Sequence, residues 1–263
     1  MPTLDSELDA ALKAMEVSFQ VRLIGTFVPT LACAPADAEA VPWLSQHYPD
    51  FDQFPVREGE ATIGVLTRRS NLGTKSVREA MQPLSEGVIV SADMPIADLI
   101  PVLRESHYRI VLSGGRIDGL VTQSDLLKLP VRMMLFGLIS HLEMCLRALV
   151  RERAPWPQWL DMLEPSKRRN EVRADVNKLK SARLEPDPLE VSNFGDLVNV
   201  LASQADLGDD FAGKADSIRL LRNDVAHGKT YIASPDDVRR FVDQFADIRA
   251  LIERASRVLR TAQ

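Results

Sequence analysis

The stretch RIVLSGGRIDGLVTQSD (109–125) decides the fold, because the earlier stretch FPVREGEATIGVLTRRS (54–70) repeats its pattern. Each stretch has an apolar segment with strand character, a turn that contains glycine, and a second apolar segment. The second segment ends in both copies as glycine, two apolar residues and threonine, at 64–67 and at 119–122. An internal repeat of this kind predicts one small α/β unit that is used twice.

The residues around the second stretch resemble a known family. An alanine-rich stretch with helical character precedes each hairpin, at 35–48 and at 95–108. SVREAMQPL, VIVSADMPIADLIPVL and RIVLSGGRIDGLVTQSDLL, taken in order, resemble a CBS motif, and residues 16–130 resemble a tandem CBS pair. The resemblance implies a domain that binds an adenine nucleotide, such as AMP or ATP, in a cleft between the copies.

One segment carries the residues that the resemblance assigns to this nucleotide: Gly119, Thr122, Ser124 and Asp125. A strand that ends at Thr122 before a helix that starts near Ser124 places hydroxyl and backbone N–H groups at a helix N-terminus, which favours phosphate. Asp125 would accept the two ribose hydroxyls. The first copy has Ser70 in place of this aspartate, so we expect one competent site, or one strong and one weak site. An ordinary helix cap explains Thr122 and Asp125 equally well, and this alternative stays open.

The composition limits the class of protein. The 263 residues carry a net charge of −5 and are 45% hydrophobic, so a soluble protein without a broadly basic surface is expected. The two cysteines lie far apart and no histidine has zinc-ligand spacing, so we expect neither a disulfide framework nor a metal site. The N-terminus lacks signal-peptide order, and charged residues interrupt the apolar run 131–150. We therefore expect a cytoplasmic protein that does not contact the membrane.

The second half of the chain has helical periodicity and no alternating pattern. Apolar residues recur at spacings of three and four, at Met134, Leu138, Leu142, Cys145 and Leu149. This first helix follows the CBS-like segment without a linker and ends before Pro155. Further helices are expected at 166–182, at 194–207, at 211–227 and from the N-cap Ser234 onward. Five helices joined by short loops predict a bundle.

The stretch RLLRNDVAHGKTY (219–231) is the candidate reaction centre of this bundle. A helical wheel places three side chains toward the core, those of Ile218, Leu221 and Val225. Asn223 and His227 share the opposite face, where an exposed Leu220 indicates contact with another chain. Gly228 fits the position that follows a helix end. A basic side chain near a helix C-terminus also stabilises the helix dipole, so a purely structural role stays open.

Arg222, Asn223 and His227 resemble the Arg-x4–6-His motif of HEPN domains, with residues 131–260 as the region of resemblance. The resemblance implies a metal-independent ribonuclease that needs no cofactor and forms a homodimer. His227 would act as general acid or base, and Arg222 would bind the phosphate. Asn223 would orient His227 or the phosphate.

The resemblance also names two supporting residues. HLEMCLRALVRE (141–152) resembles a first HEPN helix, so His141 and Glu143 are expected to assist at the reaction centre. The basic residues KRR (167–169), Lys178 and Lys180 either steer RNA or form a solvated helix face.

The sequence thus predicts a two-domain α+β protein: a CBS pair of α/β repeats over 16–130, then an all-α, HEPN-like bundle over 131–263. This order is similar to that of CRISPR-associated ribonucleases. We expect an endoribonuclease with an RNA substrate, regulated by an adenine nucleotide, in stress response or phage defence and toxin-like. Two alternatives stay open: a non-catalytic dimerisation or RNA-binding protein that responds to a nucleotide, and a constitutive nuclease that the CBS pair only scaffolds.

Overall fold

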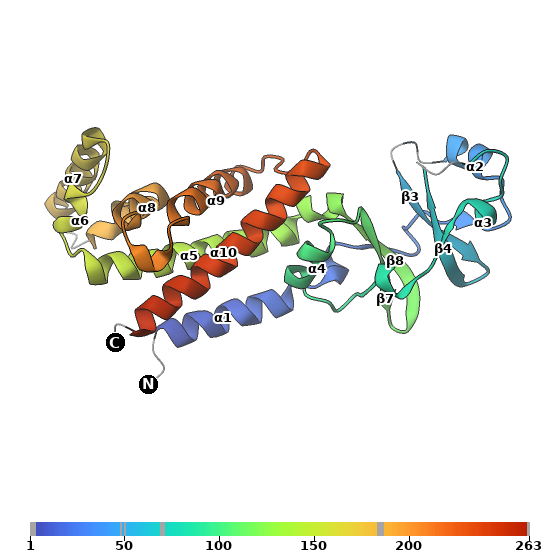
Figure 1. Cartoon of the computed structure of the whole chain (residues 1–263), viewed down its shortest axis with the longest axis horizontal. Coiled ribbons are helices and arrows are strands. Elements are labelled where there is room, and N and C mark those ends of the chain that lie inside the picture. The colour runs from blue at the N-terminus through green and yellow to red at the C-terminus, as the bar shows by residue number, and fades with distance from the viewer. Residues whose placement is uncertain (1–3, 48, 50, 69–71, 183–186, 262–263) are drawn as a thin grey trace. The chain divides into compact units, whose positions relative to one another are not determined.

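The computed structural model describes residues 4–47, 49, 51–68, 72–182 and 187–261 (Figure 1). The chain divides into two compact units. Residues 16–131 form an α/β unit, and the N-terminal residues up to Met15 join the residues from Arg132 onward in a helical unit. The expected boundary after residue 130 lies one residue away from this division. The assignment of the first 15 residues to the helical unit had no counterpart in the sequence analysis.

The described residues of the α/β unit form two mixed four-stranded sheets, with the strand orders β1-β8-β7-β6 and β2-β3-β4-β5. The strands are β1 (Thr26–Phe27), β2 (Ala34–Pro35), β3 (Gln53–Glu58), β4 (Ala61–Thr67), β5 (Gln82–Pro83), β6 (Ile89–Ser91), β7 (Tyr108–Ser113) and β8 (Arg116–Thr122). The helical segments are η1 (Val21–Leu23), α2 (Ala40–Gln46), α3 (Val77–Ala80), η2 (Glu86–Val88), α4 (Ile96–Val102) and η3 (Gln123–Leu127).

The repeat in the sequence is also a repeat in the structure. The hairpin β3–β4 pairs Gln53 with Thr67, and the hairpin β7–β8 pairs Tyr108 with Thr122. Both hairpins have a register shift at the corresponding place, between Val56 and Arg57 in the first and between Val111 and Leu112 in the second. The two hairpins that the sequence predicts are therefore confirmed, down to a shared irregularity.

Each sheet takes an edge strand from the other copy. The first copy supplies β1, which pairs with β8, and β5 of the second copy pairs with β4. The crossing strand lies so close that a Cβ atom at Gly119 would be 2.6 Å from the ring of Phe27. At Gly64 an added Cβ would be 2.6 Å from the carbonyl oxygen of Gln82. The glycine of each Gly-x-x-Thr segment is therefore explained by the close approach of a neighbouring strand.

The helical unit contains α1 and the helical segments from α5 to α10. Their bounds are α1 (Leu4–Ser18), α5 (Leu129–Arg153), α6 (Gln158–Asp161), α7 (Ser166–Ser181), η4 (Pro188–Val191), α8 (Phe194–Leu201), η5 (Ala205–Leu207), α9 (Phe211–Ala226) and α10 (Pro235–Thr261). The predicted apolar stripe of α5 is buried, at Met134, Leu138, Leu142, Cys145 and Leu149. The absence of a linker is confirmed, because α5 begins directly after the C-cap of η3. The helix α1 was not predicted.

Two further helix predictions have different outcomes. The predicted start of α10 is confirmed: Ser234 Oγ accepts from the backbone N–H of Asp237 at 3.2 Å and donates to its carboxylate at 2.9 Å. The single helix expected over 194–207 is wrong, because α8 ends at Leu201. The chain turns there, so that Leu207 is fully buried and its carbonyl accepts a hydrogen bond from Arg254.

Among the described helices, α5 alone is long and apolar enough to cross a membrane, judged by length and composition. In its most apolar window, 56% is buried inside the structure. The buried core helix of a soluble protein has the same properties, so a membrane span does not follow from this result.

Candidate functional site

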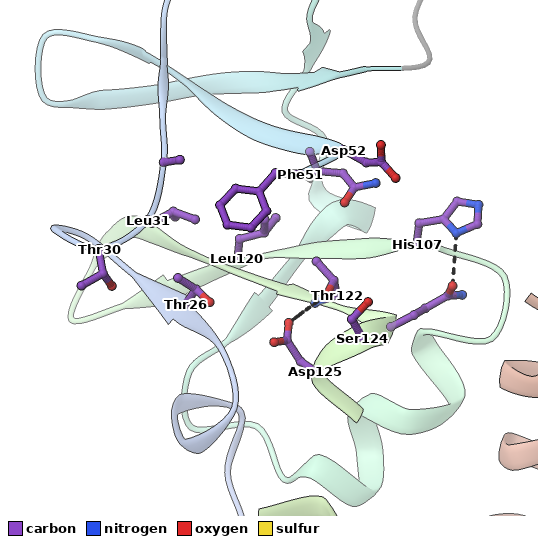
Figure 2. Close-up of a pocket in the computed structure, with 13 residues that line it drawn as sticks. Thr26, Thr30, Leu31, Phe51, Asp52, His107, Leu120, Thr122, Ser124 and Asp125 are labelled. Carbon is purple, nitrogen blue, oxygen red and sulfur yellow. Dashed lines mark hydrogen bonds between the residues drawn. The ribbon is translucent and has the colours of Figure 1, made fainter. Parts of the chain in front are cut away.

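A cavity of about 480 Å³ lies in the α/β unit beside the end of β8 (Figure 2). Both copies line it. The first copy contributes the segment around Thr30 and Leu31, and the second contributes Thr122, Ser124 and Asp125. The volume is within the range of small-molecule sites, and the lining mixes apolar side chains with hydroxyls and carboxylates. The structure thus brings three of the four predicted nucleotide residues to one cavity.

The carboxylate of Asp125 already has partners. Oδ2 accepts hydrogen bonds from the backbone N–H of Thr122 at 2.6 Å and from its hydroxyl at 3.0 Å. Oδ1 lies 2.7 Å from Nζ of Lys128, which also donates to the carbonyl of Ile24 at 2.5 Å. The cap alternative is therefore present in the structure. Of the acceptor positions on this carboxylate, one on Oδ1 remains unused, so accepting both ribose hydroxyls requires Lys128 or the Thr122 hydroxyl to move.

Ser124 and Gly119 have different positions relative to the cavity. Ser124 is exposed and lines the cavity, and within the described part of the chain its hydroxyl has no hydrogen-bond partner. The Thr122 hydroxyl donates to Asp125, whereas the Ser124 hydroxyl can donate to a phosphate. Gly119 is not among the described lining residues and packs against Phe27 instead. The structure therefore gives Gly119 a packing role.

His107 also lines the cavity and was not predicted from the sequence. Gln123 donates from Nε2 to the carbonyl of Leu103 at 2.8 Å, so its Oε1 faces Nδ1 of His107 at 3.1 Å. Nδ1 must then carry the proton, and Nε2 is the nitrogen left for a ligand. One signal was visible in the sequence: His107 directly precedes the second hairpin, at the repeat position that Asp52 occupies in the first copy.

A second cavity, of about 520 Å³, corresponds to the first one through the repeat. Thr67 and Ser85 line it, and they correspond to Thr122 and Thr30 of the first cavity. Ser70, the residue expected to weaken this site, lies outside the described residues. The guanidinium of Arg68 donates to three carbonyls that precede β3, those of Leu44, His47 and Phe51. That one cavity binds a nucleotide strongly and the other weakly therefore remains a prediction.

In the helical unit, the predicted reaction centre lies at the end of α9. His227 is the C-cap and is exposed, while Arg222 and Asn223 are half-buried. The three expected core residues are buried, namely Ile218, Leu221 and Val225. Leu220 is 53% exposed, as expected for a residue on the other face. The helical wheel is therefore confirmed, and the chemical roles of the three motif residues stay predictions.

The helix end around His227 is closed by a Schellman motif. The backbone N–H of Lys229 donates to the carbonyl of Asp224 at 2.9 Å, and that of Gly228 donates to Val225 at 3.4 Å. Gly228 has φ = 66°, the left-handed conformation that favours glycine. The predicted position of Gly228 after the helix end is confirmed.

The two predicted supporting residues lie away from His227. Arg132 contacts the segment after His227, and Glu143 follows it on α5 by about three turns, roughly 16 Å. Glu143 accepts a hydrogen bond from Arg147 at 2.6 Å, and Arg147 also bonds the η4 region at Leu189. His141 is 7% exposed. The structure thus brings neither residue to the reaction centre of the same chain, and it gives Glu143 a role in holding α5 to η4.

Two arginines of the predicted basic patch on α7, Arg168 and Arg169, form ion pairs. Arg168 donates from Nε to Oδ1 of Asp196 at 3.0 Å and from a terminal nitrogen to Oδ2 at 2.7 Å. Arg169 pairs with Glu164 at 3.3 Å. Lys178 and Lys180 lie in the last turn of α7, where positive charge stabilises the helix dipole. Arg168 therefore has a structural role, and contact of this basic patch with RNA stays a prediction.

Comparison with known proteins supports one part of this picture. Residues 77–132 match the CBS domain family. The match includes β6, α4, β7, β8 and η3, and thus the segment Thr122–Asp125. It ends at Arg132, so the resemblance of residues 131–260 to HEPN domains stays a prediction. No curated protein matches the chain.

Several solved structures of CBS domains are similar to part of this chain. The CBS domain of the bacterial CNNM/CorC family Mg2+ transporter has 22% identity and a TM-score of 0.36, over 48% of this chain and 82% of that one. Its complex with ATP has 22% identity and a TM-score of 0.37, over 49% and 98%. The CBS-pair protein CBSX2 from Arabidopsis thaliana has 14% identity and a TM-score of 0.38, over 44% and 96%.

Proposed function

We propose that this chain is a metal-independent endoribonuclease regulated by an adenine nucleotide, with the α/β unit as sensor and the helical unit as nuclease. The observation that carries the proposal is the arrangement at the end of α9. An exposed imidazole at His227 follows Arg222 and Asn223 on the same helix, and a Schellman motif fixes the backbone around it. A base, a cation and a polar group on one helix end are groups that cleavage of RNA without a metal ion can use.

The proposed reaction uses the RNA's own 2′-hydroxyl. His227 takes the proton of this hydroxyl, whose oxygen then forms a bond to the adjacent phosphorus. The bond from phosphorus to the 5′-oxygen breaks, and the leaving oxygen receives the proton that the imidazole of His227 has taken up. The products are a 2′,3′-cyclic phosphate and a 5′-hydroxyl. Arg222 binds the phosphate and stabilises its developing charge, and Asn223, one turn before His227, orients the imidazole or the phosphate.

For the sensor, the support is the CBS match together with the cavity at Thr122–Asp125. The apolar wall at Leu31 suits a base, and the Ser124 hydroxyl suits a phosphate. Among the described lining residues, His107 is the basic side chain, and Asp52 and Asp125 are acidic. This balance disfavours several phosphate charges in one place, so we expect AMP to bind more tightly than ATP.

The nuclease is tested by incubating total RNA with the full-length protein in EDTA. We expect wild-type protein to cleave RNA, and Arg222→Ala and His227→Ala to lose the activity while remaining folded. Arg219→Ala is the matched control, because Arg219 is an arginine of the same helix that pairs with Asp216 at 2.7 Å. Folded wild-type protein that binds RNA without cleaving it, under every nucleotide condition, would favour the non-catalytic alternative.

The sensor is tested by calorimetric titration with AMP and with ATP. Ser124→Tyr places a large side chain at the first cavity and Ser85→Tyr does so at the second, so the two variants tell which cavity binds. We expect Ser124→Tyr to abolish AMP binding and the effect of AMP on cleavage, with Ser85→Tyr close to wild type. Cleavage that no nucleotide changes would leave the CBS pair as a scaffold for a constitutive nuclease.

A further inference from the structure

The segment that follows His227 is fixed at two places. The Schellman motif closes the helix end through the backbone N–H groups of Gly228 and Lys229. The carbonyl of Lys229 then accepts a hydrogen bond from a terminal nitrogen of Arg132 at 2.9 Å. Arg132 lies near the start of α5, so this bond connects the segment to a different helix of the same unit.

Tyr231 provides the second anchor on the same arginine. The guanidinium carbon of Arg132 lies 5.0 Å from the centre of the Tyr231 ring, within the range of a cation–π contact. The ring is 6% exposed and lies 5.3 Å from the ring of Phe241 in α10. Arg132 therefore joins α5, the segment Lys229–Tyr231 and, through the tyrosine ring, α10.

We propose that Arg132 is a positioning residue for His227, an inference that rests on the proposed nuclease function. It touches neither RNA nor the imidazole in this proposal. It holds the backbone of Lys229, and the position of this backbone determines where the exposed His227 presents its ring. The backbone N–H of His227 itself donates to the carbonyl of Asn223 at 3.0 Å, within the last turn of the same helix. A helix end held only by its own last turn frays, whereas an anchor to a second helix keeps its geometry.

The charge and shape of arginine are both used at this position. The guanidinium of Arg132 donates to the Lys229 carbonyl while its central carbon lies over the Tyr231 ring, and a lysine ammonium lacks both the planar group and its fork of donors. Arg132→Lys should therefore retain the positive charge near the reaction centre but lose most of the positioning. Arg132→Met should lose both. Tyr231→Phe keeps the ring under the guanidinium and should behave as wild type.

The experiment measures the order of the segment and the rate of cleavage in the same full-length variants. Hydrogen exchange at residues 228–230 and the imidazole NMR signal of His227, assigned through His227→Gln, report the position without requiring activity. For Arg132→Met and Arg132→Lys we expect faster exchange and a displaced His227 signal. A misplacement near 1 Å lowers rates by up to about 10²-fold, so kcat should fall by that order while KM changes little. The matched control is Arg151→Met, because Arg151 lies on α5 and pairs with Asp187 away from the motif.

The outcomes separate the inference from the proposed function. If wild-type protein does not cleave RNA, the nuclease proposal fails, and the exchange and NMR data still decide whether Arg132 holds His227. Unchanged exchange and an unmoved His227 signal in Arg132→Met would overturn the positioning role, whatever happens to activity. A displaced signal with wild-type kcat, in a protein that does cleave RNA, would also overturn it, because the position would then not matter for the reaction.

Discussion

Replacing Arg168 with methionine should destabilise the helical unit, although the sequence places this arginine in a basic, exposed-looking helix. Its guanidinium binds both carboxylate oxygens of Asp196 and donates to the carbonyl of Val191 at 3.3 Å. Asp196 is 4% exposed and forms the capping box of α8 with Asn193. Arg168 therefore joins α7, η4 and the start of α8, and its removal leaves a buried carboxylate without its counter-ion.

The size of the expected loss of stability depends on the interactions that the Asp196 carboxylate retains. Breaking a buried ion pair by removing one partner costs about 3–5 kcal/mol. In the variant, the carboxylate of Asp196 retains one hydrogen bond, from the backbone N–H of Asn193 at 2.9 Å. In the wild-type protein, the Arg168 side chain is 23% exposed. Both facts reduce the cost, so we expect a loss of about 2–3 kcal/mol in the free energy of unfolding.

Denaturant unfolding followed by tryptophan fluorescence measures this loss in one unit. Trp156 and Trp159 belong to the helical unit, and a Trp43→Phe background removes the tryptophan signal of the α/β unit. The control is Arg173→Met, an exposed arginine of the same helix, for which we expect almost no change. Adding Asp196→Asn to Arg168→Met should recover part of the loss, because the amide carries no unpaired charge. If Arg168→Met and Arg173→Met were equally stable, the structural role assigned to Arg168 would be wrong.

Three further predictions concern packing, pH and assembly. Gly119→Ala should lower the stability of the α/β unit by about 1–3 kcal/mol, because its Cβ would meet the ring of Phe27, whereas Gly87→Ala, with open space around it, should change little in the same denaturation assay. Burial raises the pKa of Tyr231 from 10.0 to about 12. As pH rises, Tyr231 ionises first in the unfolded chain, so its contribution to the free energy of unfolding is complete below pH 10 and is lost between pH 10 and about 12. Tyr231→Phe should remove this loss from the pH dependence of unfolding. Leu220→Asp should shift a homodimer toward monomer in sedimentation analysis if the exposed face of α9 is the interface, and an unchanged dimer would exclude this face.

The sequence predicts most of the fold because its periodic signals are strong. The hairpins follow from alternating apolar residues that the repeat shows twice, and α10 follows from a cap at Ser234 with a long apolar stripe. The helix over 194–207 could not be divided in advance, because its apolar pattern continues past Leu201. What interrupts it is tertiary: the burial of Leu207 and the hydrogen bond from Arg254, a residue far away in the sequence.

The candidate sites are predicted less completely, for a physical reason. A helical wheel fixes which residues share a face of one helix, and it placed Asn223, His227 and Leu220 as the structure does. A helical wheel does not show how far along a neighbouring helix a residue lies, so Glu143 was expected near His227. It also does not show which helices contact each other. The contact of Arg132 with Lys229 depends on which end of α5 meets which end of α9, and the sequence does not state this.

Asp125 shows why a cap and a ligand site need not be alternatives. Its carboxylate holds Thr122, which keeps the end of β8 and the start of η3 in place. The same carboxylate is paired with Lys128, the C-cap of η3 and the residue directly before α5. A ribose whose two hydroxyls both bind this carboxylate would have to displace Lys128 or the Thr122 hydroxyl, because only one acceptor position, on Oδ1, is unused. Under the proposed function, a nucleotide that displaces Lys128 would change the partners of the residue directly before α5, so the same carboxylate would serve both as a cap and in sensing.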